Sequence, residues 1–271
     1  MLDQLGYDGK IIAGGQSLIA AMNFRMSQPA ALVDLNHIQE LFYIRPSSQG
    51  GISMGAMTRA STVEHEKLVA EKAPLIHEAM PCVAHPQVRN RGTFGGAVAH
   101  ADPAGQAPAL VIAMNANLLV RSKGKERWIA ADDFFAGPFT SVMDPTEMLV
   151  EIVLPPLPPR SGASYKHVAR QSGATSMVGC STVVTMDDKG NCKAAKMVLS
   201  SVGETPFTAR NASQALVGQK PSETAVQAAA EAAGQEIDPG SDIHATADFR
   251  RYLARMLVRE TLKSAFERAR A

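Results

Sequence analysis

The sequence has few of the residues that build metal centres and disulfide frameworks. Only three of its 271 residues are cysteines, Cys82, Cys180 and Cys192, and no two of them have a C-x-x-C spacing. A cysteine-ligated iron–sulfur cluster or a zinc site needs more thiolates, so neither is expected within this chain. Three scattered cysteines also do not suggest a disulfide framework, and we expect a cytoplasmic protein.

The sequence also lacks a strong charge of either sign and any long apolar run. Its formal net charge is +1, and 45% of its residues are hydrophobic while 20% are charged, as in ordinary globular proteins. Nucleic-acid binding normally needs Lys and Arg clustered on one face, so no nucleic-acid partner is expected. No run approaches the roughly 20 apolar residues of a membrane span, and the start, MLDQLGYDGK, does not resemble a secretory signal. We therefore expect no membrane insertion.

Common phosphate-binding motifs are missing as well. The chain has neither the P-loop pattern G-x-x-x-x-G-K-[ST] nor the dinucleotide fingerprint G-x-G-x-x-G. His100 and Asp102 have a metal-like spacing, but no third ligand follows at a useful separation, so no metal site is expected. No side chain is indicated as a catalytic acid or base.

Two glycine pairs are the main positive signals. The first lies in AGGQSL at residues 13–18, between a β-like run, Lys10–Ile12, and a segment with helical spacing, Ser17–Met26, for which Ser17 is a candidate N-cap. The second pair lies in GTFGGA at residues 92–97. Because glycine has no Cβ, such pairs permit positive φ and allow successive N–H groups to form an anion-binding concavity.

Together the two turns suit an elongated dinucleotide. Two separate N–H concavities fit a pyrophosphate and its ribose better than a single phosphate does. Gln16 and Ser17 add side-chain donors to the first turn, and Thr93 adds a hydroxyl donor to the second. Either pair alone is more often only a tight turn.

The main domain boundary is expected near residues 156–163, in the proline-rich stretch that begins at Pro155. It ends a strand, Glu147–Pro155, because proline cannot continue a hydrogen-bonded ladder. The segment DDFFAG, residues 132–137, is expected to be a turn with buried aromatic side chains. Other expected strands are Ala31–Leu35, Ile52–Met54, Leu118–Ser122, Trp128–Ala130, Tyr165–Ala169, Ser181–Met186 and Lys196–Ser200, and two helices, Ser222–Gln235 and Thr246–Ala269, close the chain.

The last of these helices is amphipathic. Its apolar residues fall close to one stripe, which we expect to pack on the core, and its basic residues occupy the remaining surface, which we expect to be solvated. The stripe comprises Phe249, Leu253, Met256, Leu257, Ala265 and Phe266, and the basic face comprises Arg250, Arg251, Arg255, Arg259 and Lys263.

Five segments, taken in order, resemble one family. They are AGGQSL (13–18), RNRGTFGGAVAHADPAGQAPA (89–109), DFFAGPF (133–139), EMLVEIVLP (147–155) and RRYLARMLVRETL (250–262). They resemble the FAD-binding medium subunit of the molybdenum hydroxylases, which include carbon monoxide dehydrogenase and xanthine dehydrogenase. The resemblance covers essentially the whole chain. It implies an α+β fold, with a PCMH-like FAD-binding fold of two subdomains (1–54 and 55–158) and an α/β C-terminal domain (163–271) with an antiparallel sheet and packed helices.

The resemblance also implies which residues contact FAD. In that family the two glycine turns lie at the FAD pyrophosphate and ribityl region, and further positions lie near the flavin. The implied residues are Ala13, Gly14, Gly15, Gln16, Ser17 and Leu18 from the first turn, Thr93, Gly95, Gly96 and Ala97 from the second, and Ala99, Gln106, Leu149 and Lys166 beyond it.

Three features depart from the family pattern. Relatives usually carry Asn at the position of Ala97 and an acidic residue at that of Gln106, whose amide can still accept a hydrogen bond but without charge assistance. We therefore expect weaker FAD binding. Relatives also carry a first strand and most of a helix ahead of AGGQSL. Either the start codon was placed late or the chain is naturally trimmed, and in the second case the edge beside Lys10–Ile12 is expected to be unpaired.

For function, the resemblance implies an electron-transfer flavoprotein subunit. FAD in this chain is expected to take electrons from [2Fe–2S] clusters of a small subunit and pass them to an external acceptor. Substrate oxidation is expected at the molybdopterin cofactor of a large subunit, in a dimer of heterotrimers. Two other hypotheses stay open: a stand-alone FAD-dependent oxidase and a scaffold subunit without FAD. The sequence identifies neither the substrate nor the acceptor.

Overall fold

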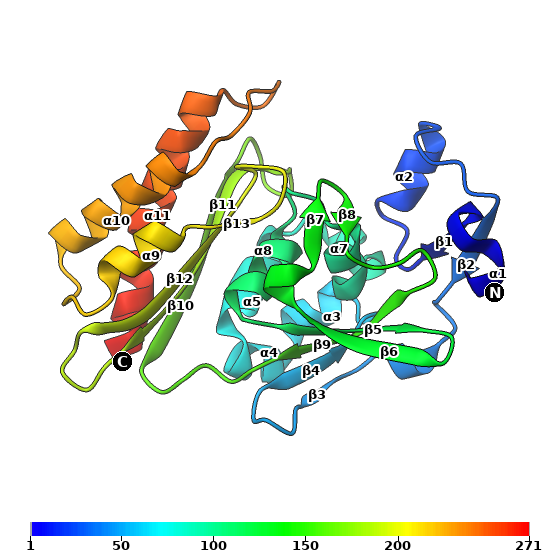
Figure 1. Ribbon diagram of the computed structural model, residues 1–271, viewed down its shortest axis with the longest axis horizontal. Helices are drawn as coiled ribbons and strands as arrows, with labels where there is room; N and C mark the ends of the chain where they lie inside the picture. Colours follow the sequence, from blue (N-terminus) through cyan, green and yellow to red (C-terminus); the bar gives the residue numbers. More distant parts are fainter. Residues whose placement is uncertain (1, 271) are drawn as a thin grey trace.

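The computed structural model describes residues 2–270 as three successive units (Figure 1). The N-terminal unit lies at the right of that view, a central unit of sheet and helices in the middle, and a C-terminal sheet with its helices at the left. Helices and strands are mixed throughout, and the sheet of the C-terminal unit is antiparallel. The predicted fold class is therefore confirmed.

The N-terminal unit is built on one parallel strand pair. It comprises α1 (Leu2–Leu5), a 3-10 turn (Gly6–Asp8), β1 (Gly9–Ile12), α2 (Leu18–Asn23) and β2 (Ala31–Asp34). β1 and β2 pair with Gly9 opposite Ala31, and the connection between them carries the first glycine turn and α2. Both strands begin and end within about one residue of the sequence prediction, whereas α2 is shorter than the predicted helix.

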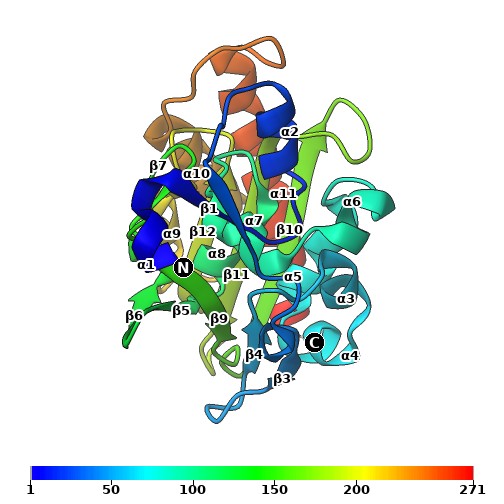
Figure 2. The same ribbon diagram turned by 90° about the vertical axis from the view of Figure 1, so that its right-hand side faces the viewer.

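The central unit is a five-stranded antiparallel sheet with its helices packed on one face (Figure 2). The strand order is β3-β4-β9-β5-β6. The strands are β3 (Ile44–Pro46), β4 (Ile52–Gly55), β5 (Asn117–Ser122), β6 (Lys125–Ala130) and β9 (Met148–Leu154), and a small hairpin is formed by β7 (Phe135–Gly137) and β8 (Thr140–Ser141). The helices are α3 (Ala60–His65), α4 (Lys67–Lys72), α5 (Pro74–Ala79), α6 (Pro86–Arg91), α7 (Phe94–His100) and α8 (Gln106–Ala113).

The core of the central unit explains this packing. Side chains of alternate strand residues, such as Met54, Leu118 and Ile152, face the helices and are completely buried. On the opposite face of the sheet a second, smaller cluster joins the N-terminal unit to the sheet. Its buried members are Leu35, Leu41, Met57, Leu119 and Val150. The N-terminal unit is thus held by apolar contacts that follow directly from strand alternation.

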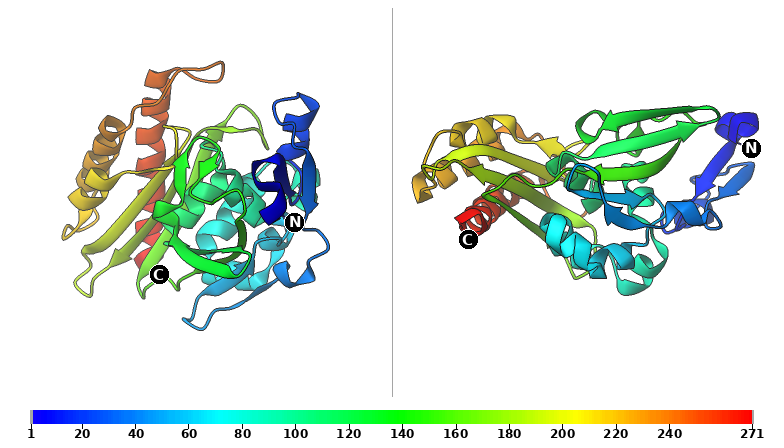
Figure 3. Two further views of the ribbon diagram at one scale, coloured as in Figure 1. Left: turned by 45° about the vertical axis from the view of Figure 1, so that its right-hand side comes forward. Right: turned by 90° about the horizontal axis from the view of Figure 1, so that it is seen from below.

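The C-terminal unit is an antiparallel sheet with helices on one face and the central unit on the other (Figure 3). Its strands are β10 (Ser161–Ala169), β11 (Ser176–Met186), β12 (Cys192–Ser200) and β13 (Phe207–Thr208), and its helices are α9 (Arg210–Leu216), α10 (Glu223–Glu236) and α11 (Ala247–Arg270). Ala163 and Tyr165 of β10 are buried in the central core, whereas neighbouring β10 residues face α11. None of the helices described between residues 2 and 270 has the length and apolar composition of a membrane span.

Helix α11 follows the predicted stripe except at its start. Leu253, Leu257 and Phe266 are buried, as predicted, but Phe249 is 43% exposed. Arg250, predicted to be solvated, is only 5% exposed. Its guanidinium pairs with Asp242 at 2.7 Å and donates to the carbonyl oxygens of Met177 and Ser201. The prediction for Arg250 is therefore wrong, because a carboxylate and two strand-end carbonyls compensate for its burial.

The close packing of α11 on β10 makes Gly162 a sensitive position. A Cβ atom at Gly162 would lie 1.9 Å from the carbonyl oxygen of Ala265. We expect Gly162→Ala to lower the free energy of unfolding by about 3 kcal/mol, because helix and strand must separate. Gly240→Ala is the matched control, since a Cβ there meets nothing within 4 Å. Urea unfolding of both variants measures this difference, and equal stabilities would contradict the packing.

Candidate functional site

The first glycine turn presents a run of unpaired backbone donors. Gly15 has φ +72°, in the left-handed region that favours glycine. The N–H groups of Gly14, Gly15, Gln16 and Ser17 donate to no acceptor within residues 2–270. The Gln16 side chain folds back to the Gly14 carbonyl oxygen at 3.1 Å, and Ser17 occupies the N-cap position of α2 without a side-chain capping bond. The turn therefore offers the N–H concavity that an anion requires.

The two glycine segments lie in direct contact. A Cβ at Gly14 would lie 2.3 Å from the carbonyl oxygen of Arg91 and 2.6 Å from Cα of Gly92. A Cβ at Gly96 would lie 3.4 Å from Cβ of Ala13. Only a residue without a side chain fits at Gly14. The structure thus brings together two turns that are far apart in the sequence, as the prediction of a shared ligand requires.

A polar clamp, missed by the sequence analysis, fixes the first turn. Nδ2 of Asn36 donates to the Ala13 carbonyl oxygen at 2.8 Å. Arg59 donates to Oδ1 of Asn36 at 2.6 Å and also to the carbonyl oxygen of Arg91. Arg59 therefore bridges the two glycine segments. The local sequence signal is D-L-N at the end of β2. Asp34 accepts hydrogen bonds from the backbone N–H and the side chain of Asn36, and these bonds lower the pKa of Asp34.

The second glycine turn differs from its prediction. The N–H groups of Phe94 to Ala97 are all used within the chain: Phe94 donates to Thr58, Gly95 to Ala56, Gly96 to Thr93 Oγ1 and Ala97 to the Thr93 carbonyl oxygen. Neither Gly95 nor Gly96 has a positive φ, because both belong to α7. The prediction of a second N–H concavity is therefore wrong, and the Thr93 hydroxyl oxygen serves as the N-cap acceptor of α7.

The glycines of the second turn serve close approach instead. A Cβ at Gly95 would lie 2.5 Å from backbone atoms of Ala56, and one at Gly96 would lie 2.5 Å from Thr93 Oγ1. Beyond them, Ala97 is exposed and Ala99 is half-buried on α7. Because several side chains along this helix are small or absent, few atoms project from its surface beside the first turn. Such a surface lets a ligand approach the backbone closely.

The remaining candidates are distributed over three elements. Gln106 begins α8 and is buried, and its Nε2 lies 3.4 Å from both the Cys82 carbonyl oxygen and Ser176 Oγ. Leu149, in β9, is buried in the central core. Lys166 does not join them. It is exposed on β10, and its Nζ pairs with Glu260 of α11 at 3.0 Å, which places it on the helix-covered face of the sheet.

The neighbours of Lys166 face the central unit and form a buried polar cluster. Tyr165 is 4% exposed and its hydroxyl has no partner among residues 2–270, and the same holds for Ser200 Oγ. Both hydroxyls lie beside Gly179, where a Cβ would be 3.2 Å and 2.6 Å from them. Nδ1 of His167 lies 2.9 Å from Ser176 Oγ. Burial raises the pKa of Tyr165 and lowers that of His167. The sequence around Lys166 did not predict this cluster.

Strained backbone gathers at the loop between α7 and α8. Ala101, Phe139 and Ser201 have φ of +53°, +53° and +63°. Phe139 donates its N–H to the Ala101 carbonyl oxygen at 3.0 Å, and Ser201 donates to that of Pro103 at 2.9 Å. The Phe139 ring, on the β7–β8 hairpin, lies 5.1 Å from the His100 ring. Strain of this kind is typical of functional sites. The two hydrogen bonds fix the segment between Ala99 and Gln106.

Comparison with known proteins identifies the class of this site. Residues 1–157 match the FAD binding domain in molybdopterin dehydrogenase, and residues 163–265 match the CO dehydrogenase flavoprotein C-terminal domain. The chain therefore belongs to the FAD-binding medium subunits of the molybdenum hydroxylases, which are oxidoreductases. The resemblance seen in the sequence is confirmed.

Individual relatives cover nearly the whole chain. The chain is 39% identical to the 6-hydroxypseudooxynicotine dehydrogenase complex subunit alpha of Paenarthrobacter nicotinovorans, covering 98% of this chain and 89% of that one. It is 35% identical to the carbon monoxide dehydrogenase medium chain of Hydrogenophaga pseudoflava, covering 99% and 93%. A solved structure of carbon monoxide dehydrogenase from the latter organism, lacking the Mo-pyranopterin moiety, superimposes with a TM-score of 0.95 at 36% identity, covering 98% and 92%.

The residues of the site fit FAD. The unpaired N–H groups of Gly14 to Ser17 are suitable donors for a pyrophosphate, and the side-chain-free surfaces of Gly14 and Gly96 form a cradle that a Cβ would fill. The departures at Ala97 and Gln106 remove a side-chain amide and a negative charge but leave this cradle unchanged. FAD is thus compatible with the geometry of the first turn.

The half-buried His167 generates a testable pH dependence. Because burial lowers the pKa of His167, the unfolded chain binds this proton more readily than the folded chain below pH about 6.5. The free energy of unfolding therefore decreases as the pH is lowered through that range. We expect His167→Gln to flatten the fall in urea titrations at successive pH values, while His244→Gln, an exposed control, leaves it unchanged. An unaltered slope in His167→Gln would argue against a lowered pKa at His167.

Proposed function

We propose that this chain is the electron-exit subunit of a cytoplasmic molybdenum dehydrogenase. It takes electrons from [2Fe–2S] clusters of a small partner subunit, holds FAD, and passes electrons to an external acceptor. The large partner subunit oxidises the substrate at a molybdopterin cofactor, and the assembly is a dimer of heterotrimers. The observation that carries this proposal is the unpaired N–H run of Gly14 to Ser17 against the second glycine segment, within a chain of this family.

The first turn and its surroundings hold the cofactor. Residues 13–18 bind the pyrophosphate through backbone N–H groups, with Leu18 at the start of α2. Thr93, Gly95 and Gly96, with Ala97 and Ala99, supply a low surface along α7 for the ribityl region. Bound FAD supplies the redox chemistry, since a flavin accepts electrons singly and releases them as a pair.

The flavin ring is proposed to lie near the other candidates. Leu149 contributes an apolar contact from β9. Nε2 of Gln106 donates to the Cys82 carbonyl oxygen and to Ser176 Oγ. The side-chain carbonyl oxygen of Gln106 is therefore the group that accepts a hydrogen bond from a hydroxyl of the cofactor. Lys166 acts at most through the position of β10, because its ammonium pairs with Glu260.

The cysteines favour clusters outside this chain. Cys180 and Cys192 are buried and Cys82 is half-buried. Burial raises the pKa of all three, that of Cys192 to about 11, so none of them is a thiolate at neutral pH by itself. This supports the proposal that electrons reach FAD from clusters in a partner.

The two alternatives have less support. A stand-alone oxidase needs its own substrate pocket over the flavin. The C-terminal sheet is not available as a cap over the flavin, because α9 to α11 cover one face and the central unit packs against the other. A scaffold without FAD is prompted by Ala97 and Gln106, but the run of donors in the first turn would then bind only water.

The glycine contact gives a direct test of the cofactor site. We expect Gly14→Ala to weaken FAD binding by at least about tenfold, because its Cβ would displace the first turn from Arg91 and Gly92. Flavin content after purification and reconstitution with FAD measure the effect. Gly137→Ala is the control, since a Cβ there meets nothing within 4 Å. Full flavin content in Gly14→Ala would contradict the cradle.

The electron-exit role is tested in the assembled complex. When substrate is added to a complex carrying Gly14→Ala, the clusters should become reduced while turnover with the external acceptor is lost and partly returns with excess FAD. A wild-type complex whose flavin stays oxidised after substrate reduces the clusters would overturn the proposal.

A further inference from the structure

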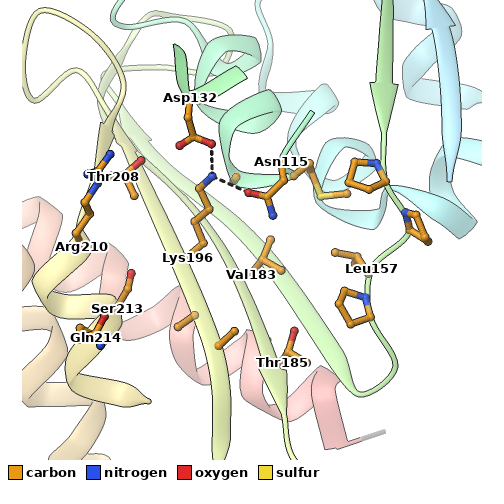
Figure 4. A pocket seen from close by; sticks show the side chains of 17 residues that line it. Asn115, Asp132, Leu157, Val183, Thr185, Lys196, Thr208, Arg210, Ser213 and Gln214 are labelled. Atoms are coloured by element: carbon orange, nitrogen blue, oxygen red, sulfur yellow. Dashed lines mark hydrogen bonds and ion pairs between the residues drawn. The ribbon is translucent and has the colours of Figure 1, made fainter. Parts of the chain in front are cut away.

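A pocket lies between the central and C-terminal units, away from both glycine turns (Figure 4). Its volume is about 520 Å³, within the range of small-molecule sites. One wall is the proline-rich connector at the expected domain boundary, Pro155 to Pro158. In Figure 4, Leu157 of this wall lies opposite Arg210, Ser213 and Gln214.

The pocket is apolar on its floor and at the connector. Val183 of β11 forms part of the floor, and Ala194 and Ala195 of β12 and Met114 after α8 also line it. Three residues of the connector wall are prolines, which lack N–H donors. These surfaces suit a ligand with an apolar ring or chain.

Polar groups converge between the walls. Nζ of Lys196 lies 2.7 Å from Oδ1 of Asn115 and 2.7 Å from Oδ2 of Asp132, and Figure 4 shows both contacts. An ammonium has three donors, so one remains after these two bonds. The Lys196 side chain lines the pocket and is only 20% exposed.

Arg210 gives the pocket its unbalanced charge. Asp132 neutralises Lys196, whereas Arg210 forms no ion pair with any carboxylate in residues 2–270. The lining residues therefore carry a net charge of +1, from Lys196 and Arg210 against Asp132. Thr208 and Gln214 add uncharged polar groups on the same side as Arg210. A single negative charge on the ligand complements this arrangement.

We propose that this interdomain pocket binds a small organic monoanion, a carboxylate with an apolar ring or chain. The carboxylate pairs with Arg210 and accepts from Lys196, and the apolar part lies between the connector and Val183. A small molecule fits better than a protein segment, because two units of this same chain supply opposing walls and β11 and β12 close the floor. Since both units contact it, the ligand stabilises their mutual arrangement. This inference does not depend on the FAD site.

Benzoate is a suitable probe, with benzamide as its neutral counterpart of the same shape. We expect saturable binding of benzoate to the FAD-loaded chain with a Kd of about 1 mM or tighter, and at least about tenfold weaker binding of benzamide, measured by ligand-observed NMR. Benzoate should also raise the Tm in a concentration-dependent way. Absence of benzoate binding, or equal binding of benzamide, would overturn the proposal.

Two variants locate the binding. We expect Arg210→Gln to weaken benzoate binding at least about tenfold. Arg259→Gln, which removes an exposed arginine of α11 far from the pocket lining, should leave it unchanged. Equal loss in both variants would indicate a nonspecific charge effect. Loss of benzoate binding on assembly with partner subunits would identify the pocket as a subunit interface, and either result would overturn the proposal.

Discussion

The contact between Gly14 and the backbone of Arg91 and Gly92 is the constraint on which the cofactor site depends. It brings the turn after β1 against the end of α6 and the link to α7, which belong to a different unit. No side chain fits there, since even a Cβ would lie 2.3 Å from a carbonyl oxygen. Arg59 and Asn36 then fix the same two segments by hydrogen bonds. The site is therefore made by the docking of two units and not by either unit alone.

The two glycine segments divide the work of binding. The first provides unpaired N–H groups, and the second provides a smooth helix surface whose own N–H groups are already bonded. The C-terminal unit completes the surroundings with Tyr165, His167 and Ser176, which meet Gln106 across the domain boundary. In the proposed function, this chain positions the flavin while the clusters and the substrate site belong to partners.

Much of the fold could be predicted from the sequence, because it depends on local patterns. The strands follow from alternation, and the end of β9 at the prolines follows from proline chemistry. The fate of individual polar groups could not be predicted. The N–H groups of Gly95 and Gly96 donate to Ala56 and Thr93. Ala56 is far away in the sequence, so only the tertiary structure supplies that acceptor.

The same reason explains the other differences at the site and in α11. Arg250 is buried because Asp242 and two carbonyl groups reach it from outside its helix. Lys166 lies on the helix-covered face because strand alternation places Tyr165 in the central core. Resemblance to a family places a residue such as Lys166 on a strand. The face of the sheet on which its side chain lies depends on the register and on the neighbouring layers.

The most direct test of this account is an FAD titration of the ¹⁵N-labelled, FAD-depleted chain followed through its backbone amide signals. The account predicts the largest changes at the N–H groups of Gly14, Gly15, Gln16 and Ser17, with smaller changes at Gly95 and Gly96, whose N–H groups are already bonded within the chain. Changes concentrated at Gly95 and Gly96, with none at Gly14 to Ser17, would contradict it.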